Sequence, residues 1–270
     1  MNRPDDPRRP SARRDEQRRP TRVAEPPLAD HITADQVDRS VHRELRTLSK
    51  DNAEGVARHL VAVTEALAAE ELDVALAHAQ TATRRAGRVS IVRETLGLVH
   101  YRRAEWAKAL SEFRTARRLS GSAHLLPLIA DTERGLGRPE RAVELAAGPE
   151  AGRLDAADRM ELALVVSGAR RDLGQSRAAV HSLRDLVRST TASAPGAGRL
   201  YYAYADALLA DGKAEESREW LRRAADADPQ GLTDAAQRLG DSTADVIDLE
   251  QGAPEPAEAA DEAPAGSSDE

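Results

Sequence analysis

The sequence predicts an all-α fold, a solenoid of antiparallel helical hairpins, and three observations support this prediction. A small residue recurs along the chain at spacings of 34, 33, 37 and 38 residues, and the last three of these residues each follow a glycine by five positions. A period near 34 residues is typical of stacked two-helix repeats. Hydrophobic residues make up 40% of the chain but aromatic residues only 3%, a composition that suits close helix packing. The recurring residues are Ala75, Ala109, Ala142, Ala179 and Ser217.

The chain begins with an arm, residues 1–28, that is rich in Pro and Arg and has no hydrophobic periodicity, so we expect it to be disordered. Apolar residues then recur at helical spacing from Val37 to Leu48, and Thr33 or Asp35 can cap a leading helix. Two further helices are expected, over residues 52–69 and 72–86. The second of them begins the repeat array proper.

The unit at residues 90–123 shows the repeat most clearly. Large apolar residues alternate in it with small ones at the positions where two helices would cross. Helix axes 8–10 Å apart need small side chains at the crossing point. His100 falls among the positions that face the core, so we expect a packed, hydrogen-bonded imidazole. The large residues are Leu96, Trp106 and Phe113, and the small ones are Gly97, Ala109 and Ala116.

This pattern resembles the tetratricopeptide repeat (TPR), a 34-residue helix–turn–helix, and the resemblance extends over residues 54–231. The chain also looks like repeat proteins of GC-rich bacteria. The resemblance implies a solenoid over residues 33–240, with a capping helix near residues 233–239 and a disordered acidic tail at residues 241–270. In the last unit, Tyr201 and Tyr204 are expected in the core. The predicted units are 54–87, 90–123, 123–147, 157–188 and 198–231.

Several classes of function are excluded or disfavoured. The chain has no cysteine, which excludes disulfides and thiolate chemistry. Its seven histidines show no metal-ligand spacing, and no phosphate-binding loop is present. No apolar run is long enough to span a membrane, and the N-terminus has no apolar segment typical of a secretory signal. We therefore expect a cytoplasmic protein that is not an enzyme and needs neither cofactor nor metal.

The main functional hypothesis is a scaffold or adaptor that binds a protein segment in a concave groove. In the TPR family the first helix of each hairpin lines this groove. Transferring that register to this chain gives eight groove candidates: Glu94, Tyr101, Arg102, Asp131, Arg134, Arg171, Tyr202 and Asp206.

A basic stretch supports an alternative hypothesis, an adaptor associated with nucleic acid. Residues 84–118 carry ten basic side chains against three acids, and residues 1–22 carry a net charge of +4. Such charge suits an anionic partner, although Arg side chains that pair with acids of adjacent repeats would give the same composition. The basic residues are Arg84, Arg85, Arg88, Arg93, Arg102, Arg103, Lys108, Arg114, Arg117 and Arg118.

The acidic tail suggests a further possibility. Residues 241–270 contain ten acids and no Lys or Arg, with a short apolar stretch at Val246, Ile247 and Leu249. The tail is therefore either a solubilising segment or a plug that docks on the solenoid and covers the basic stretch.

Overall fold

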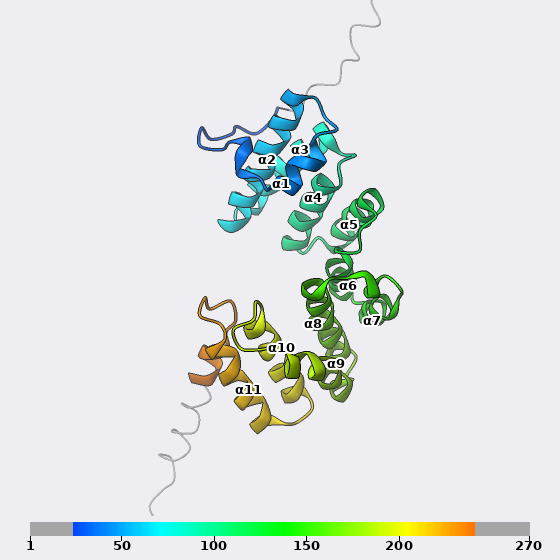
Figure 1. Ribbon diagram of the computed structural model, residues 1–270, viewed down its shortest axis with the longest axis vertical. Coiled ribbons are helices and arrows are strands. Elements are labelled where there is room, and N and C mark those ends of the chain that lie inside the picture. The colour runs from blue at the N-terminus through cyan, green and yellow to red at the C-terminus, as the bar shows by residue number, and fades with distance from the viewer. Residues whose placement is uncertain (1–23, 241–270) are drawn as a thin grey trace, which may run out of the picture. The chain divides into compact units, whose positions relative to one another are not determined.

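The computed structural model describes residues 24–240 of the chain, and Figure 1 shows them as helices joined by loops. No strand occurs among these residues, which confirms the all-α prediction. The chain divides into two compact units, Met1–Gly121 and Ser122–Glu270. The predictions for residues 1–23 and for the tail at 241–270 lie outside the described residues.

Unit 1 contains two helical hairpins preceded by a short N-terminal cap. The helix α2 pairs with α3, and α4 pairs with α5. The 3-10 helix η1 and the short helix α1 pack on α2. The bounds are η1 Ala34–Gln36, α1 Arg39–Leu45, α2 Lys50–Ala68, α3 Leu72–Ala86, α4 Ser90–Arg102 and α5 Trp106–Ser120.

The prediction of one leading helix is wrong. The segment forms η1 and α1, separated by Val37 and Asp38 in extended conformation. A capping box between Thr33 and Gln36 fixes the first turn. Val37 then packs against buried residues around Ile32 and Leu45. Tertiary burial of this side chain therefore overrides the helical periodicity.

Unit 2 contains three hairpins and a terminal helix. The helix α6 pairs with α7, α8 with α9, and α10 with α11. Residues 235–240 are helical and Ala235 is buried against the last hairpin, so this terminal helix caps it as expected. The bounds are α6 Leu126–Gly135, α7 Pro139–Ala147, η2 Ala151–Arg153, α8 Ala156–Asp172, α9 Ser176–Ser189, α10 Ala197–Ala210 and α11 Ala214–Asp226.

The recurring small residues lie where the helices of each hairpin meet. All five are buried, with at most 2% of their surface exposed. Tyr201 and Tyr204 are also buried, as predicted, and both pack against Trp220. His100 is buried too, and its Nδ1 lies 2.6 Å from a carboxylate oxygen of Glu105. These observations confirm the register on which the hairpin prediction depends.

The turns between paired helices share one backbone conformation. Gly137, Gly174 and Gly212 have φ between 69° and 78°, the left-handed region in which glycine carries no steric penalty. In the first two hairpins the same position is occupied by Glu70, with φ 60°, and Ala104, with φ 55°. The turn geometry is thus imposed by hairpin packing even where the sequence supplies no glycine.

Residues 24–28, the end of the predicted arm, lie against unit 1. Leu28 packs on a cluster formed by Ile32 and residues of α2. Glu25 accepts hydrogen bonds from the guanidinium of Arg85, at the end of α3. These contacts hold residues 24–28 against α2 and α3.

Candidate functional site

In unit 2, charged side chains link the first helices of consecutive hairpins. Arg134 on α6 donates one hydrogen bond to Asp131, 2.6 Å away, and another to Asp172 on α8, 2.7 Å away. Arg171 on α8 donates in turn to Asp206 on α10, at 3.1 Å. Each arginine therefore joins its own helix to the first helix of the next hairpin.

The terminal helix continues this series. Arg238 donates to the second carboxylate oxygen of Asp206 at 2.8 Å and to the Tyr202 hydroxyl at 2.9 Å. Its guanidinium also lies 5.2 Å from the centroid of the Tyr202 ring. Burial raises the pKa of this phenol, so it stays protonated near neutral pH. We call this set the ladder: Asp131, Arg134, Arg171, Asp172, Tyr202, Asp206 and Arg238.

The chain backbone makes room for the ladder at Gly168. A Cβ atom added there would lie 3.0 Å from the Cζ and Nη1 atoms of Arg134. The guanidinium of Arg134 thus lies over the backbone of α8. Burial works to lower the pKa of Arg134, but Asp172 and Asp131 outweigh it, so the net shift is upward. The position of the charge is fixed by packing as well as by ion pairs.

The repeat register points to one equivalent position that was not among the predicted groove candidates. Arg134, Arg171 and Leu209 each lie eight positions before the small crossing residue of their hairpin. Leu209 is 48% exposed. It follows Tyr202 and Asp206 at helical spacing, so all three share one face of α10. The ladder face therefore carries an exposed apolar side chain, and the register alone could have located it.

The three groove candidates of unit 1 lie in different surroundings. Tyr101 packs edge-on against Trp106, with ring centroids 5.3 Å apart, and also meets Phe113. Arg102 pairs with Glu70 at 2.8 Å, in the turn that follows α2. Glu94 is half-buried on α4.

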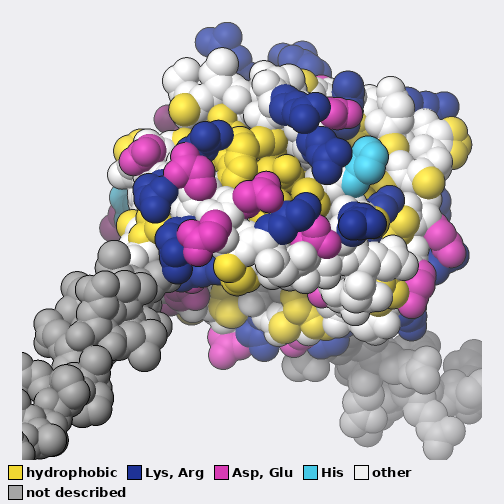
Figure 2. All heavy atoms as spheres, turned by 90° about the horizontal axis from the view of Figure 1, so that it is seen from below, with side chains coloured by type: hydrophobic (Ala, Val, Ile, Leu, Met, Phe, Trp, Pro, Cys, Tyr) yellow, Lys and Arg dark blue, Asp and Glu magenta, His cyan; other side chains and the backbone are white. Residues whose placement is uncertain are grey.

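The basic stretch of residues 84–118 is partly neutralised within unit 1. The ion pairs connect Arg85 with Glu25, Arg93 with Glu112, Arg102 with Glu70, Arg103 with Asp73 and Glu105, and Lys108 with Glu105. Opposite charges are interspersed elsewhere as well: Figure 2 shows acidic and basic side chains around a hydrophobic area on the face seen from below.

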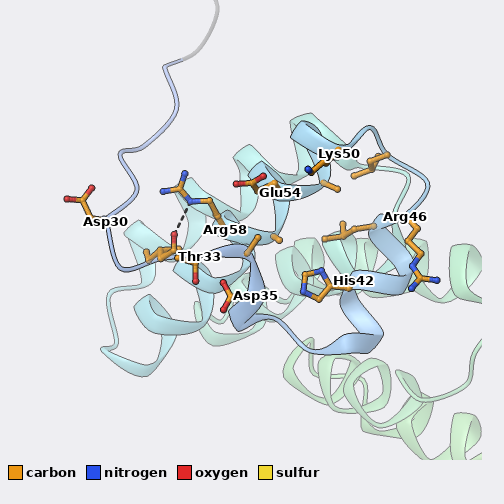
Figure 3. A pocket seen from close by; sticks show the side chains of 14 residues that line it. Asp30, Thr33, Asp35, His42, Arg46, Lys50, Glu54 and Arg58 are labelled. Carbon is orange, nitrogen blue, oxygen red and sulfur yellow. Dashed lines mark hydrogen bonds between the residues drawn. The ribbon is translucent and has the colours of Figure 1, made fainter.

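Unit 1 also contains an open cavity of about 760 Å³ between the N-terminal cap and α2. Figure 3 shows Asp35 and His42 on one side of it and Glu54 and Arg58 on the other. Arg58 donates to the carbonyl of Ile32 at 2.9 Å, which holds the cap in place. Acidic and basic side chains balance along the rim, so the cavity does not select a ligand by charge.

Residues 24–240 contain neither of two further kinds of site. No group of three or more His, Asp or Glu side chains is arranged to hold a metal ion. No helix in this range is long and apolar enough to cross a membrane.

Comparison with known proteins agrees with the hairpin architecture. The tetratricopeptide repeat model matches residues 60–124 and 169–231. No curated protein matches this chain in sequence. Nine chains of solved structure match it. One is YrrB, a TPR protein with an unusual peptide-binding site, which is 16% identical, with a TM-score of 0.40 over 68% of this chain and 91% of that one. The family match and the buried crossing residues identify residues 60–124 and 169–231 as tetratricopeptide repeats, and proteins built from these repeats are in general interaction scaffolds.

Proposed function

We propose that this protein is a non-enzymatic scaffold that binds an extended protein segment on the ladder face of unit 2. The observation that carries the proposal is the combination of the exposed side chain of Leu209 with the fixed charges of Arg134 and Arg171. These three residues occupy equivalent positions on α10, α6 and α8. They offer one apolar and two cationic contacts at the spacing of successive hairpins.

The ladder is organised before any partner binds. Between a quarter and a third of each side chain of Arg134, Arg171 and Arg238 stays exposed. A partner can therefore reach these guanidinium groups without first breaking their ion pairs. Because the side chains are already fixed, little conformational entropy is lost on binding.

Leu209 supplies the apolar contribution. Burying apolar surface stabilises a complex by roughly 25 cal/mol per Å², so covering one half-exposed leucine contributes on the order of 1 kcal/mol. A partner segment with an aliphatic side chain flanked by polar groups fits this face best.

Affinity capture of the full-length protein from its own lysate, with and without nuclease, tests the proposal. Leu209→Asp should lose the retained protein partner, whereas Val74→Asp should keep it. Val74 is a matched control because it is 45% exposed but lies at the start of α3, outside the ladder. A partner lost equally by both variants would contradict the assignment of this face.

The nucleic-acid hypothesis is the alternative. It has less support because at least five of the ten basic side chains in residues 84–118 form ion pairs with acids of unit 1. Retained material that disappears on nuclease treatment, with an affinity that falls steeply as salt rises, would favour it over the scaffold.

A further inference from the structure

A second surface, separate from the ladder, lies where α3 and α5 end in unit 1. Arg93, at the start of α4, donates a hydrogen bond to the carbonyl of Gly87 at 2.7 Å and another to Glu112 at 3.0 Å. Gly87 directly follows α3, and Glu112 lies near the middle of α5. Because α4 and α5 form an antiparallel hairpin, in which Gly97 contacts Phe113, α5 ends beside the start of α4. The two helices therefore present their C-terminal turns at the same edge of the unit.

Three exposed arginines lie in or next to these turns: Arg84 and Arg88 at the end of α3, and Arg118 at the end of α5. Leu119 follows Arg118 in the chain and is 41% exposed. Few large apolar side chains among the described residues are exposed to this extent. We call this surface the basic edge: Arg84, Arg88, Arg118 and Leu119.

The chain itself contains a segment of the opposite character. Residues 244–250 carry three acids, Asp245, Asp248 and Glu250, interleaved with Val246, Ile247 and Leu249. An acidic segment with aliphatic residues complements a basic surface with an exposed leucine in both respects. The basic edge lies in unit 1 and the segment lies in unit 2. A second copy of the chain can therefore supply the segment.

We propose that the basic edge of unit 1 binds residues 244–250 of a second copy of this chain. The contact is heterologous, because the two surfaces differ, so each copy can both give and receive a segment. Association then depends on concentration and weakens with salt, since exposed charges are screened. It is independent of the ladder and of the proposed groove partner.

The edge favours an acidic peptide over nucleic acid for two reasons. No aromatic side chain is among the edge residues, so bases would find no stacking platform. Leu119 gains from an aliphatic partner but not from a phosphate backbone. An acidic peptide with aliphatic side chains uses every feature of the surface.

Sedimentation of the full-length chain over a range of concentrations, at low and high salt, tests the proposal. Arg84→Glu combined with Arg118→Glu should weaken self-association about tenfold or more, because two attractive pairs become repulsive. Arg177→Glu with Arg184→Glu is the matched control. These residues are exposed on α9, and the control chain has the same net charge.

A charge exchange makes the test specific. Adding Asp245→Arg and Asp248→Arg to the edge variant should restore association, because the complementarity is then reversed rather than lost. A fluorescent peptide of residues 243–252 should bind the full-length chain with the same dependence on Arg84 and Arg118.

The proposal would be overturned if the edge variant associated as strongly as the original chain. It would also be overturned if the charge exchange failed to restore association. A chain that stays monomeric at all concentrations would overturn the second copy as the source of the segment. Binding of a single-stranded oligonucleotide that needs Arg84 and Arg118, with no peptide binding, would assign the edge to nucleic acid instead.

Discussion

The ring of Phe113 on α5 packs directly against the backbone of Gly97 on α4. A Cβ atom at Gly97 would lie 2.7 Å from two carbon atoms of the ring, closer than van der Waals contact permits. Phe113 is fully buried and cannot move aside without displacing its neighbours. The close approach of the two helices therefore depends on the missing side chain.

Gly97→Ala should consequently lower the free energy of unfolding by about 1–3 kcal/mol, although alanine is the better helix former. Thermal unfolding followed by circular dichroism measures the change. Gly152→Ala is the control, because nothing lies within 4 Å of the added atom, and it should have little effect. Equal stability of both variants would contradict the packing described.

Ala109→Trp should destabilise unit 1 at the crossing point of α4 and α5. Ala109 has no exposed surface, so a larger side chain must push the helices apart, at a cost of about 1–3 kcal/mol or more. The same substitution two positions earlier, at the exposed Ala107, should leave the melting temperature nearly unchanged. A stable Ala109→Trp variant would count against the register.

Ala104→Gly should stabilise the protein. Ala104 adopts φ 55°, a conformation that costs an L-residue about 1–2 kcal/mol and that glycine adopts freely. Part of this gain is lost to the greater entropy of glycine in the unfolded chain, so we expect a net increase of about 0.5–1 kcal/mol.

The reverse change in an equivalent turn, Gly137→Ala, should lower stability by a similar amount. Nothing lies within 4 Å of an added Cβ atom at Gly137, so strain of the backbone is its only cost. Chemical denaturation measures the free energy of unfolding of both variants. Changes of the same sign in Ala104→Gly and Gly137→Ala would contradict the argument.

Because two imidazoles are buried against each other, we expect the protein to lose stability in mild acid. His59 Nδ1 and His78 Nδ1 lie 2.9 Å apart, so one must donate and the other accept, which requires an unprotonated nitrogen. The pKa of His59 is lowered to about 4, mainly by burial and also by the neighbouring His78 and Arg85, while Glu25 acts in the opposite direction. Burial also lowers the pKa of His78.

The folded pKa of His59 is thus below its ordinary value of 6.5. The unfolded chain takes up the proton first as the pH falls, so stability is complete above about pH 6.5 and is lost towards pH 4. The loss should be on the order of 2 kcal/mol. His59→Gln should flatten this part of the pH profile, whereas His181→Gln, at an exposed position on α9, should not.

Asp206 holds Arg171 and Arg238 at once, so Asp206→Asn should weaken both connections. Because hydrogen bonds to charged groups contribute about 1.5–3 kcal/mol, we expect a loss in that range. Hydrogen exchange should increase in residues 235–240, which Arg238 ties to α10. Glu215→Gln, which breaks an exposed pair with Arg218, should change stability by less than about 0.5 kcal/mol.

The hairpins could be predicted because their determinants are local. Small residues at the crossing points and apolar residues at helical spacing locate α2 to α11, and the predicted bounds of α3 agree with the structure. The same register leads to Leu209. Of the groove candidates, the five in unit 2 lie together on the ladder, although which acid pairs with which arginine could not be predicted.

The remaining features depend on side chains that are distant in sequence. Glu25 meets Arg85 across 60 residues, and Arg238 meets Tyr202 across 36. The break at Val37 likewise follows from burial against other elements. Periodicity reports only which face of a helix is apolar and carries no information about such partners.

The sequence by itself therefore determined the repeat and the helix pairing, because these follow from side-chain size and spacing along one chain. Only the tertiary structure decided which charges are paired, which apolar side chains stay open and how the N-terminal cap covers α2. Those features arise from distances between helices, and a charge far along the chain becomes a partner only when packing brings it within hydrogen-bonding reach.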